Sequence, residues 1–175
     1  MLYETCPDCG VKLPIVTNNK ITHRYIGASS SCWLLFSSLQ NANEPPIASG
    51  ELNPLLLDAY CVQHHGVVSR QAINSVAVHA LSLFGVLEKG VSADKTYWIR
   101  KQVAKKKNRK GIDNRFYWLE PPSSNKCMTI VDIIKEKTPF TRSIKLQEYV
   151  KSIWNEWFKL HGSTLAYWYK QYIEE

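Results

Sequence analysis

The sequence predicts a mainly α-helical, compact domain with a zinc knuckle at its N-terminus and at most a minor extended or β element. Apolar residues recur every three or four positions over residues 69–87 and again over 144–160, which is typical of amphipathic helices. Polar stretches rich in proline, glycine or asparagine separate the helical segments. Near the N-terminus, two cysteines separated by two residues form a pattern that can bind a metal ion.

The length and composition predict one domain. A chain of 175 residues with 45% hydrophobic residues can bury a sizeable core. We expect residues 1–33 to form the zinc-knuckle part and to pack on a helical core formed by 55–175. The sequence has no apolar window long enough to span a membrane and no secretory signal at its start. We therefore expect a cytoplasmic protein whose five cysteines stay reduced.

The first stretch that carries chemistry is the turn Cys6-Pro7-Asp8-Cys9-Gly10. Two cysteines with this spacing can bind one metal ion from a single tight turn, and the following glycine lets backbone amides point at the sulfur. A redox CxxC pair is the alternative interpretation. Redox pairs normally lie where a strand meets a helix, and the surrounding sequence lacks that pattern. The metal knuckle is therefore the favoured prediction.

The serines at 29–31 predict the start of a helix, because serine side chains cap the free N–H groups of a first turn. The apolar residues that follow at helical spacing are Trp33, Leu35, Phe36 and Leu39. Cys32 falls in the first turn, where the helix dipole favours a thiolate and so favours a metal ligand. A cysteine that only fills space in the core is the alternative interpretation.

The centre of the chain predicts two helices joined by a polar corner. Residues 55–63 are expected as a short helix, and the corner QHHG at 63–66 places two imidazoles side by side. Ser69 is expected to cap a long second helix that ends before Gly90. The apolar face of this long helix is Ile73, Val76, Ala77, Ala80, Leu81, Phe84 and Leu87.

The C-terminal half predicts three further helices. One covers the first part of 93–110 and ends among the basic residues. Residues 115–119 (RFYWL) are expected to be extended, and a short helix with a capping-box pattern follows over 129–137. The last long helix covers 144–160. After it, Gly162-Ser163 either kinks the helix or stops it and caps a new one.

Five stretches of the chain match motifs of one protein family. They are CPDCG at 6–10, HRYIGASSSCW at 23–33, LDAYCVQHHG at 57–66, SRQAINSVAVHAL at 69–81 and SIWNEWFKLH at 152–161. On these motifs the chain resembles uncharacterised bacterial proteins grouped only as a domain of unknown function. That family typically has Gln-His-Pro-Gly where this chain has Gln-His-His-Gly, so His64 is the residue that matches. The resemblance implies a fold and site residues, but no activity.

The resemblance adds two ligands to the cysteine pair. Cys32 and His64 lie in the matching motifs, and with Cys6 and Cys9 they complete a predicted tetrahedral zinc site. Four protein ligands fill such a site, so the zinc would be structural. It would pin the N-terminal residues, which contain few apolar positions, to the helical corner.

The two remaining cysteines are weaker candidates. Cys61 lies one helical turn before the corner histidines, but its place inside an apolar helix favours a core thiol. Cys127 stands alone in the sequence, and we do not expect it to bind the metal.

The net charge of +7 arises in one segment, residues 100–110, and outside it the basic and acidic residues balance. The basic residues of this segment are Arg100, Lys101, Lys105, Lys106, Lys107, Arg109 and Lys110. Such a cluster can neutralise several phosphates and bind nucleic acid without sequence preference. The first functional hypothesis is therefore a zinc-stabilised helical module that binds a macromolecule, either nucleic acid through this segment or another protein. A solvated charged loop is the alternative interpretation.

The second functional hypothesis is a metal-dependent enzyme. Histidines and acidic residues from several helices could share a pocket and act as acid–base groups or bind a second metal. The candidates are Asp58, Tyr60, His65, His79 and His161. Each of them also fits a polar residue at the edge of the core, and for His79 that is the favoured interpretation. The sequence has no nucleophile motif, phosphate-binding loop or HExxH motif, so it assigns no reaction.

Overall fold

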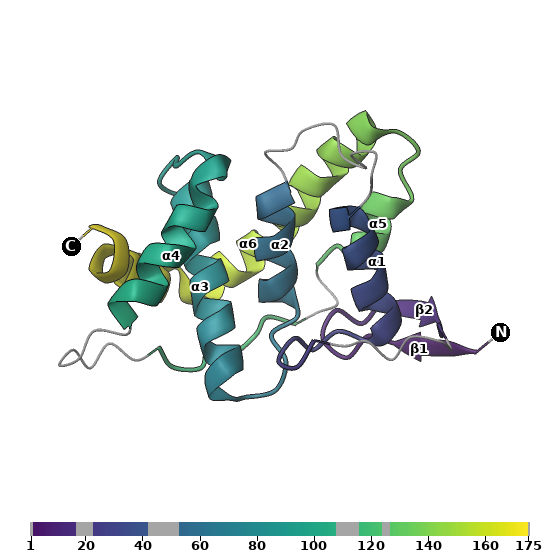
Figure 1. Cartoon of the computed structure of the whole chain (residues 1–175), viewed down its shortest axis with the longest axis horizontal. Coiled ribbons are helices and arrows are strands. Elements are labelled where there is room, and N and C mark those ends of the chain that lie inside the picture. The colour runs from purple at the N-terminus through teal and green to yellow at the C-terminus, as the bar shows by residue number, and fades with distance from the viewer. Residues whose placement is uncertain (1, 17–22, 42–52, 108–115, 124–126, 175) are drawn as a thin grey trace.

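The protein is described by a computed structural model that covers residues 2–16, 23–41, 53–107, 116–123 and 127–174. Within these ranges the chain forms six α-helices and one two-stranded sheet, so the prediction of a mainly helical fold is confirmed. The sheet and α1 lie at one end of the molecule, and α4 and the C-terminus lie at the other (Figure 1). None of the described helices combines the length and the apolar character that crossing a membrane requires.

The minor β element is a hairpin that holds the cysteine turn. Strand β1 (Tyr3–Thr5) pairs with β2 (Lys12–Pro14) in antiparallel register, with Glu4 opposite Leu13. Just beyond the paired residues, the Cys6 N–H donates to the Val11 carbonyl at 2.8 Å. Gly10 adopts a φ of 73°, a conformation that glycine reaches without strain. The turn thus points its two cysteines away from the strands and toward the helices.

Helix α1 (Ser30–Asn41) begins where the serines predict. Ser29 caps it, because its hydroxyl accepts from the Cys32 N–H at 3.3 Å. Ser31 ties the helix to the hairpin: its N–H donates to Glu4 Oε1 at 2.8 Å and its hydroxyl donates to the Pro14 carbonyl at 2.8 Å. These bonds orient the first turn of α1 over the cysteine turn.

Helices α2 (Asn53–Gln63) and α3 (Arg70–Leu87) form the predicted pair. Ser69 caps α3 as expected, with its hydroxyl accepting from the Ala72 N–H at 3.1 Å. The corner between the helices begins after Gln63, the last residue of α2. The Gln63 side chain is held in place by hydrogen bonds to two residues from later in the chain. Tyr149 donates from its hydroxyl to Gln63 Oε1 at 2.9 Å, and Gln63 Nε2 donates to the Met128 carbonyl at 2.7 Å.

Two further helices follow. A 3-10 turn, η2 (Ala93–Lys95), leads into α4 (Thr96–Lys107), which packs along α3. Residues 116–122 have no regular secondary structure, and the preceding residues of that predicted extended piece lie outside the described ranges. Helix α5 (Ile130–Ile134) carries the expected capping box, in which the Thr129 N–H donates to Asp132 Oδ2 at 2.8 Å.

Helix α6 (Pro139–Tyr169) is longer than expected and ends in a π-helical turn, η4 (Lys170–Glu174). Of the two alternatives at Gly162-Ser163, the one in which the helix stops is wrong. The face that buries Trp157 continues beyond the glycine with Leu165 and Trp168. This burial outweighs the cost of one glycine inside a helix, which is about 1 kcal/mol.

A buried polar network joins α2, α3 and α4. Asp58 of α2 is completely buried, and its carboxylate accepts three hydrogen bonds of 2.6 Å. The donors are His79 Nδ1 and the Ser82 hydroxyl of α3 and Arg100 Nη1 of α4. A buried carboxylate is stable only when it is paired and hydrogen-bonded, so Asp58 and its two cationic partners depend on one another.

We predict that Asp58→Asn lowers the free energy of unfolding by about 3–5 kcal/mol, because it leaves Arg100 and His79 without their buried counter-charge. Chemical denaturation measures the change. Asp94→Asn, the same substitution at an exposed residue of η2, serves as the control and should change stability by less than about 0.5 kcal/mol. Equal effects of the two substitutions would show that the network contributes nothing.

Candidate metal centre

Four side chains from three separate segments meet at one point: Cys6, Cys9, Cys32 and His64. The first two come from the hairpin turn, the third from the first turn of α1, and the fourth from the residue that follows α2. Their exposed fractions are 0%, 4%, 0% and 1%, and their candidate ligand atoms all lie within 4.8 Å of one another. The structure thus brings together the four residues that the sequence predicts as ligands.

The spacing of these atoms suits tetrahedral coordination. Metal–sulfur bonds of about 2.3 Å in a tetrahedron place two sulfurs about 3.8 Å apart. Here the Sγ atoms of Cys9 and Cys32 are 3.9 Å apart, and Cys32 Sγ lies 3.4 Å from His64 Nε2. A cluster of three sulfurs and one imidazole nitrogen with these separations can hold a metal ion.

The orientation of His64 is set by the last turn of α2. Its Nδ1–H donates to the Tyr60 carbonyl at 3.0 Å, so in the neutral ring Nε2, which faces Cys32 Sγ, is the nitrogen without a proton. The same carbonyl accepts the backbone N–H of His64 at 2.9 Å. The Tyr60 ring lies against the imidazole, with their centroids 3.9 Å apart. The helix end therefore fixes both the tautomer and the direction of the ligand.

Hydrogen bonds also reach the sulfurs. The Ser29 N–H donates to Cys6 Sγ at 3.5 Å, and the Tyr60 hydroxyl donates to Cys32 Sγ at 3.5 Å. Hydrogen bonds from Cys32 and Cys9 lower the pKa of Cys6, and the same sharing raises the pKa of Cys32. The three thiols by themselves thus favour one thiolate. A divalent cation supplies the positive charge that would allow all three to ionise.

Two glycines let the segments approach closely. Gly66 has a φ of +68°, and a Cβ at this position would lie 2.7 Å from the Tyr25 carbonyl oxygen. Its N–H donates to Asp8 Oδ2 at 2.7 Å, so the cysteine turn is joined directly to the helical corner. A Cβ at Gly27 would lie 2.0 Å from the same carboxylate. Asp8, which lies between the two cysteines, is a supporting residue that the sequence alone did not single out.

The remaining acid–base candidates lie in different surroundings. His79 belongs to the Asp58 network, whereas His65 lies beside Asp8, with 3.8 Å between its Nδ1 and Oδ2. His161 Nε2 lies 2.8 Å from the Glu120 carbonyl oxygen, which can only accept, so this nitrogen carries the proton and donates it. No hydrogen bond or ion pair joins these three histidines within the described part of the chain. The structure does not gather them into one pocket.

The other two cysteines lie outside the cluster. Cys61 is buried in α2 and faces His79, and Cys127 is half-buried with its thiol 3.9 Å from the Ser152 carbonyl. Both placements agree with the expectation that neither thiol is a ligand.

Some basic residues of the segment 100–110 are bound to other parts of the protein, and others are exposed. Arg100 is bound to Asp58, and Lys106 donates to the Gln171 carbonyl at 3.2 Å, so both have partners in the protein. Lys101 and Lys105 are exposed on α4, and Lys107 is the last residue of that helix. The two other basic residues named for this segment, Arg109 and Lys110, lie outside the described ranges.

Comparison with known proteins gives a family but no function. A model of a family of unknown function, DUF5946, matches residues 4–158. This range contains all four residues of the cluster and most of α6. No curated protein and no solved structure matches the chain.

We predict that Gly66→Ala destabilises the protein by about 2 kcal/mol more than Gly90→Ala, as measured by thermal or chemical unfolding. Both glycines have a positive φ, so both substitutions carry the same backbone strain of about 1–2 kcal/mol. Only Gly66 faces a backbone atom, whereas a Cβ at Gly90 would meet nothing within 4 Å. Equal losses would mean that the close approach to Tyr25 does not hold the corner in place.

Proposed function

This chain belongs to the DUF5946 family of unknown function, and we propose that it is a helical module that is stabilised by a structural zinc ion and binds nucleic acid. The observation that carries the proposal is the buried cluster of three cysteine sulfurs and one histidine nitrogen. The nucleic-acid part rests on a second observation, the exposed face of α4.

Zinc is the metal that this donor set favours. Thiolate and imidazole ligands in a tetrahedral arrangement are typical of zinc, and hard cations such as magnesium and calcium prefer oxygen. A structural role follows from the closed geometry. Four protein ligands fill a tetrahedral site, and all four are buried, so no coordination position remains for water or a substrate.

The zinc would attach the N-terminal segments to the helices. In the described residues before α1, the buried apolar side chains outside the cysteine turn are those of Leu13, Ile26 and Ala28. This small apolar area gives little stability, whereas metal binding in small zinc domains contributes directly to the free energy of folding. Here the cluster connects the hairpin, α1 and the end of α2.

We predict that the purified protein contains one zinc ion and that Cys6→Ser loses it and melts about 10 °C lower. Elemental mass spectrometry and thermal unfolding test the two statements. Cys127→Ser is the matched control, because this half-buried cysteine is outside the cluster, and it should retain the metal. A metal-free protein whose stability does not change in Cys6→Ser would overturn the structural-zinc proposal.

The nucleic-acid surface that we propose is the outward face of α4, defined by the exposed residues Tyr97, Trp98, Lys101 and Lys105. Three of them follow one another at intervals of four, and Lys101 Nζ lies 6.0 Å from the centre of the Tyr97 ring. The helix sequence contains no acidic residue. Lysines can neutralise phosphates, and exposed aromatic rings can stack on unpaired bases, so this face fits single-stranded nucleic acid.

Catalysis at the metal is less favoured, because the closed cluster offers no position for a substrate. The histidines of the enzyme hypothesis also lie apart. The histidine–carboxylate pair of His79 and Asp58 lies outside the metal cluster.

We predict that the double variant Lys101→Ala/Lys105→Ala binds a single-stranded oligonucleotide more weakly and with a smaller salt dependence. The slope of log K against log salt should fall by about 0.7 for each phosphate that the variant no longer neutralises. Fluorescence anisotropy at several salt concentrations measures it. Lys151→Ala/Lys159→Ala removes two exposed lysines of α6 and is the matched control. Identical slopes for both double variants would exclude α4 as the binding face.

A further inference from the structure

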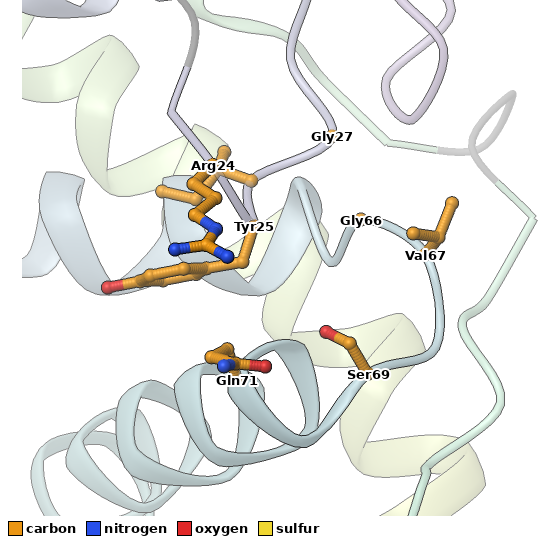
Figure 2. A pocket seen from close by; sticks show the side chains of 8 residues that line it. Arg24, Tyr25, Gly27, Gly66, Val67, Ser69 and Gln71 are labelled. Carbon is orange, nitrogen blue, oxygen red and sulfur yellow. The ribbon is translucent and has the colours of Figure 1, made fainter.

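Two hollows lie side by side along the first half of α3. The first has a volume of about 370 Å³ and lies between residues 24–27 and the start of the helix (Figure 2). The second has a volume of about 330 Å³ and is lined by Tyr25, Gln71, Asn74, Ser75, Val78 and His79. The two share Tyr25 and Gln71, so they are adjacent. Volumes of this order suit small ligands.

Each hollow is lined by one basic side chain and by no acidic one. Arg24 belongs to the first hollow, which Tyr25 and Gln71 also line (Figure 2). His79 belongs to the second hollow, and its side chain remains 16% exposed. An anion in the second hollow would therefore lie beside the His79 side chain, and Arg24 lines the adjacent hollow.

His79 is held in its charged form by the residues behind it. Burial opposes the charge, but Cys61 and the hydrogen-bonded Asp58 carboxylate raise the pKa of His79 to about 10. Arg100 on α4 shares the same carboxylate through Oδ1. The hydrogen bond to the Asp58 carboxylate and the raised pKa of His79 favour the imidazolium form, which suits anion binding better than the role of a general base.

Neutral polar groups complete the second hollow. The amide oxygen of Asn74 is inaccessible, and it has no hydrogen-bond partner within the described part of the chain. Such groups are uncommon in folded proteins and require a partner. Rotation of the amide exchanges its oxygen and nitrogen, so Asn74 can either accept from a ligand or donate to it.

We propose that the hollow at His79 binds a small ligand through an oxyanion group, a phosphate or a carboxylate, which the imidazolium contacts while Asp58 holds the ring in place. This site is separate from the metal cluster and from the outward face of α4, since it shares no residue with either. It is a binding site for a small molecule, in a position that the proposed structural and nucleic-acid roles do not use.

The experiment follows the histidine imidazole signals by NMR while inorganic phosphate or, separately, acetate is added to the full-length protein. At about pH 8 an ordinary histidine is neutral, so it responds little to an anion. The expected result is a saturable shift of His79 with at least one of the two anions and no such shift of His161. A response to phosphate alone identifies a phosphate ligand, and a response to acetate identifies a carboxylate. No saturable shift of His79 with either anion would overturn the proposal.

A pair of variants locates the site without disturbing the Asp58 network. Asn74→Asp places a negative charge in the hollow and should weaken binding of the active anion at least about tenfold, equivalent to 1.4 kcal/mol. Asn155→Asp makes the same change at an exposed position of α6 and should bind like the unmodified protein. Equal affinities of the two variants would also overturn the proposal, because the anion would then bind elsewhere.

Discussion

The constraint on which the N-terminal third depends is that four buried side chains must meet where the hairpin, which buries few apolar residues, joins α1 and the end of α2. The hairpin turn, the first turn of α1 and the end of α2 converge within 4.8 Å at this point. Hydrogen bonds between backbone N–H groups and side chains connect these segments. They involve Ser29, Asp8 and Gly66. Hydrogen bonds alone contribute only about 1 kcal/mol each, so a cation among the sulfurs would be the dominant attachment.

Helix α2 connects this cluster to the rest of the molecule. The Tyr60 carbonyl in its last turn orients His64 of the candidate metal cluster, and the buried Asp58 of the same helix holds α3 and α4 through His79 and Arg100. Gln63 joins the end of the same helix to α6. A helix of eleven residues thus reaches most of the fold, which explains why so many of its side chains are buried. A change in the position of α2 would therefore displace both His64 in the candidate metal cluster and His79 in its hollow.

Sequence patterns within single segments predicted the helices and the cysteine turn, because neighbouring residues determine both. The helices followed from apolar spacing and serine caps, and the Cys6–Cys9 pair followed from its own spacing. The completion of the ligand set needed the family resemblance, because nothing local relates Cys32 to His64. Arg100 was counted with the basic run, since its partner Asp58 lies 42 positions away and only the packing of α4 on α3 brings them together. The sequence leaves open whether α6 continues through Gly162 for the same reason: the continuation depends on burial contributed by other segments.

The separation of the ligands along the chain also bears on the order in which the protein folds. Cys9 and Cys32 are 23 positions apart, and Cys32 and His64 are a further 32 apart. Closing loops of this length in an unfolded chain costs several kcal/mol of entropy, whereas the Cys6–Cys9 turn is local. An ion bound by the cluster would therefore meet the local Cys6–Cys9 pair first, and Cys32 and His64 only after the two longer loops have closed. Coordination by all four residues would thus depend on contacts between distant segments, whereas binding by the first two cysteines would need only a local turn.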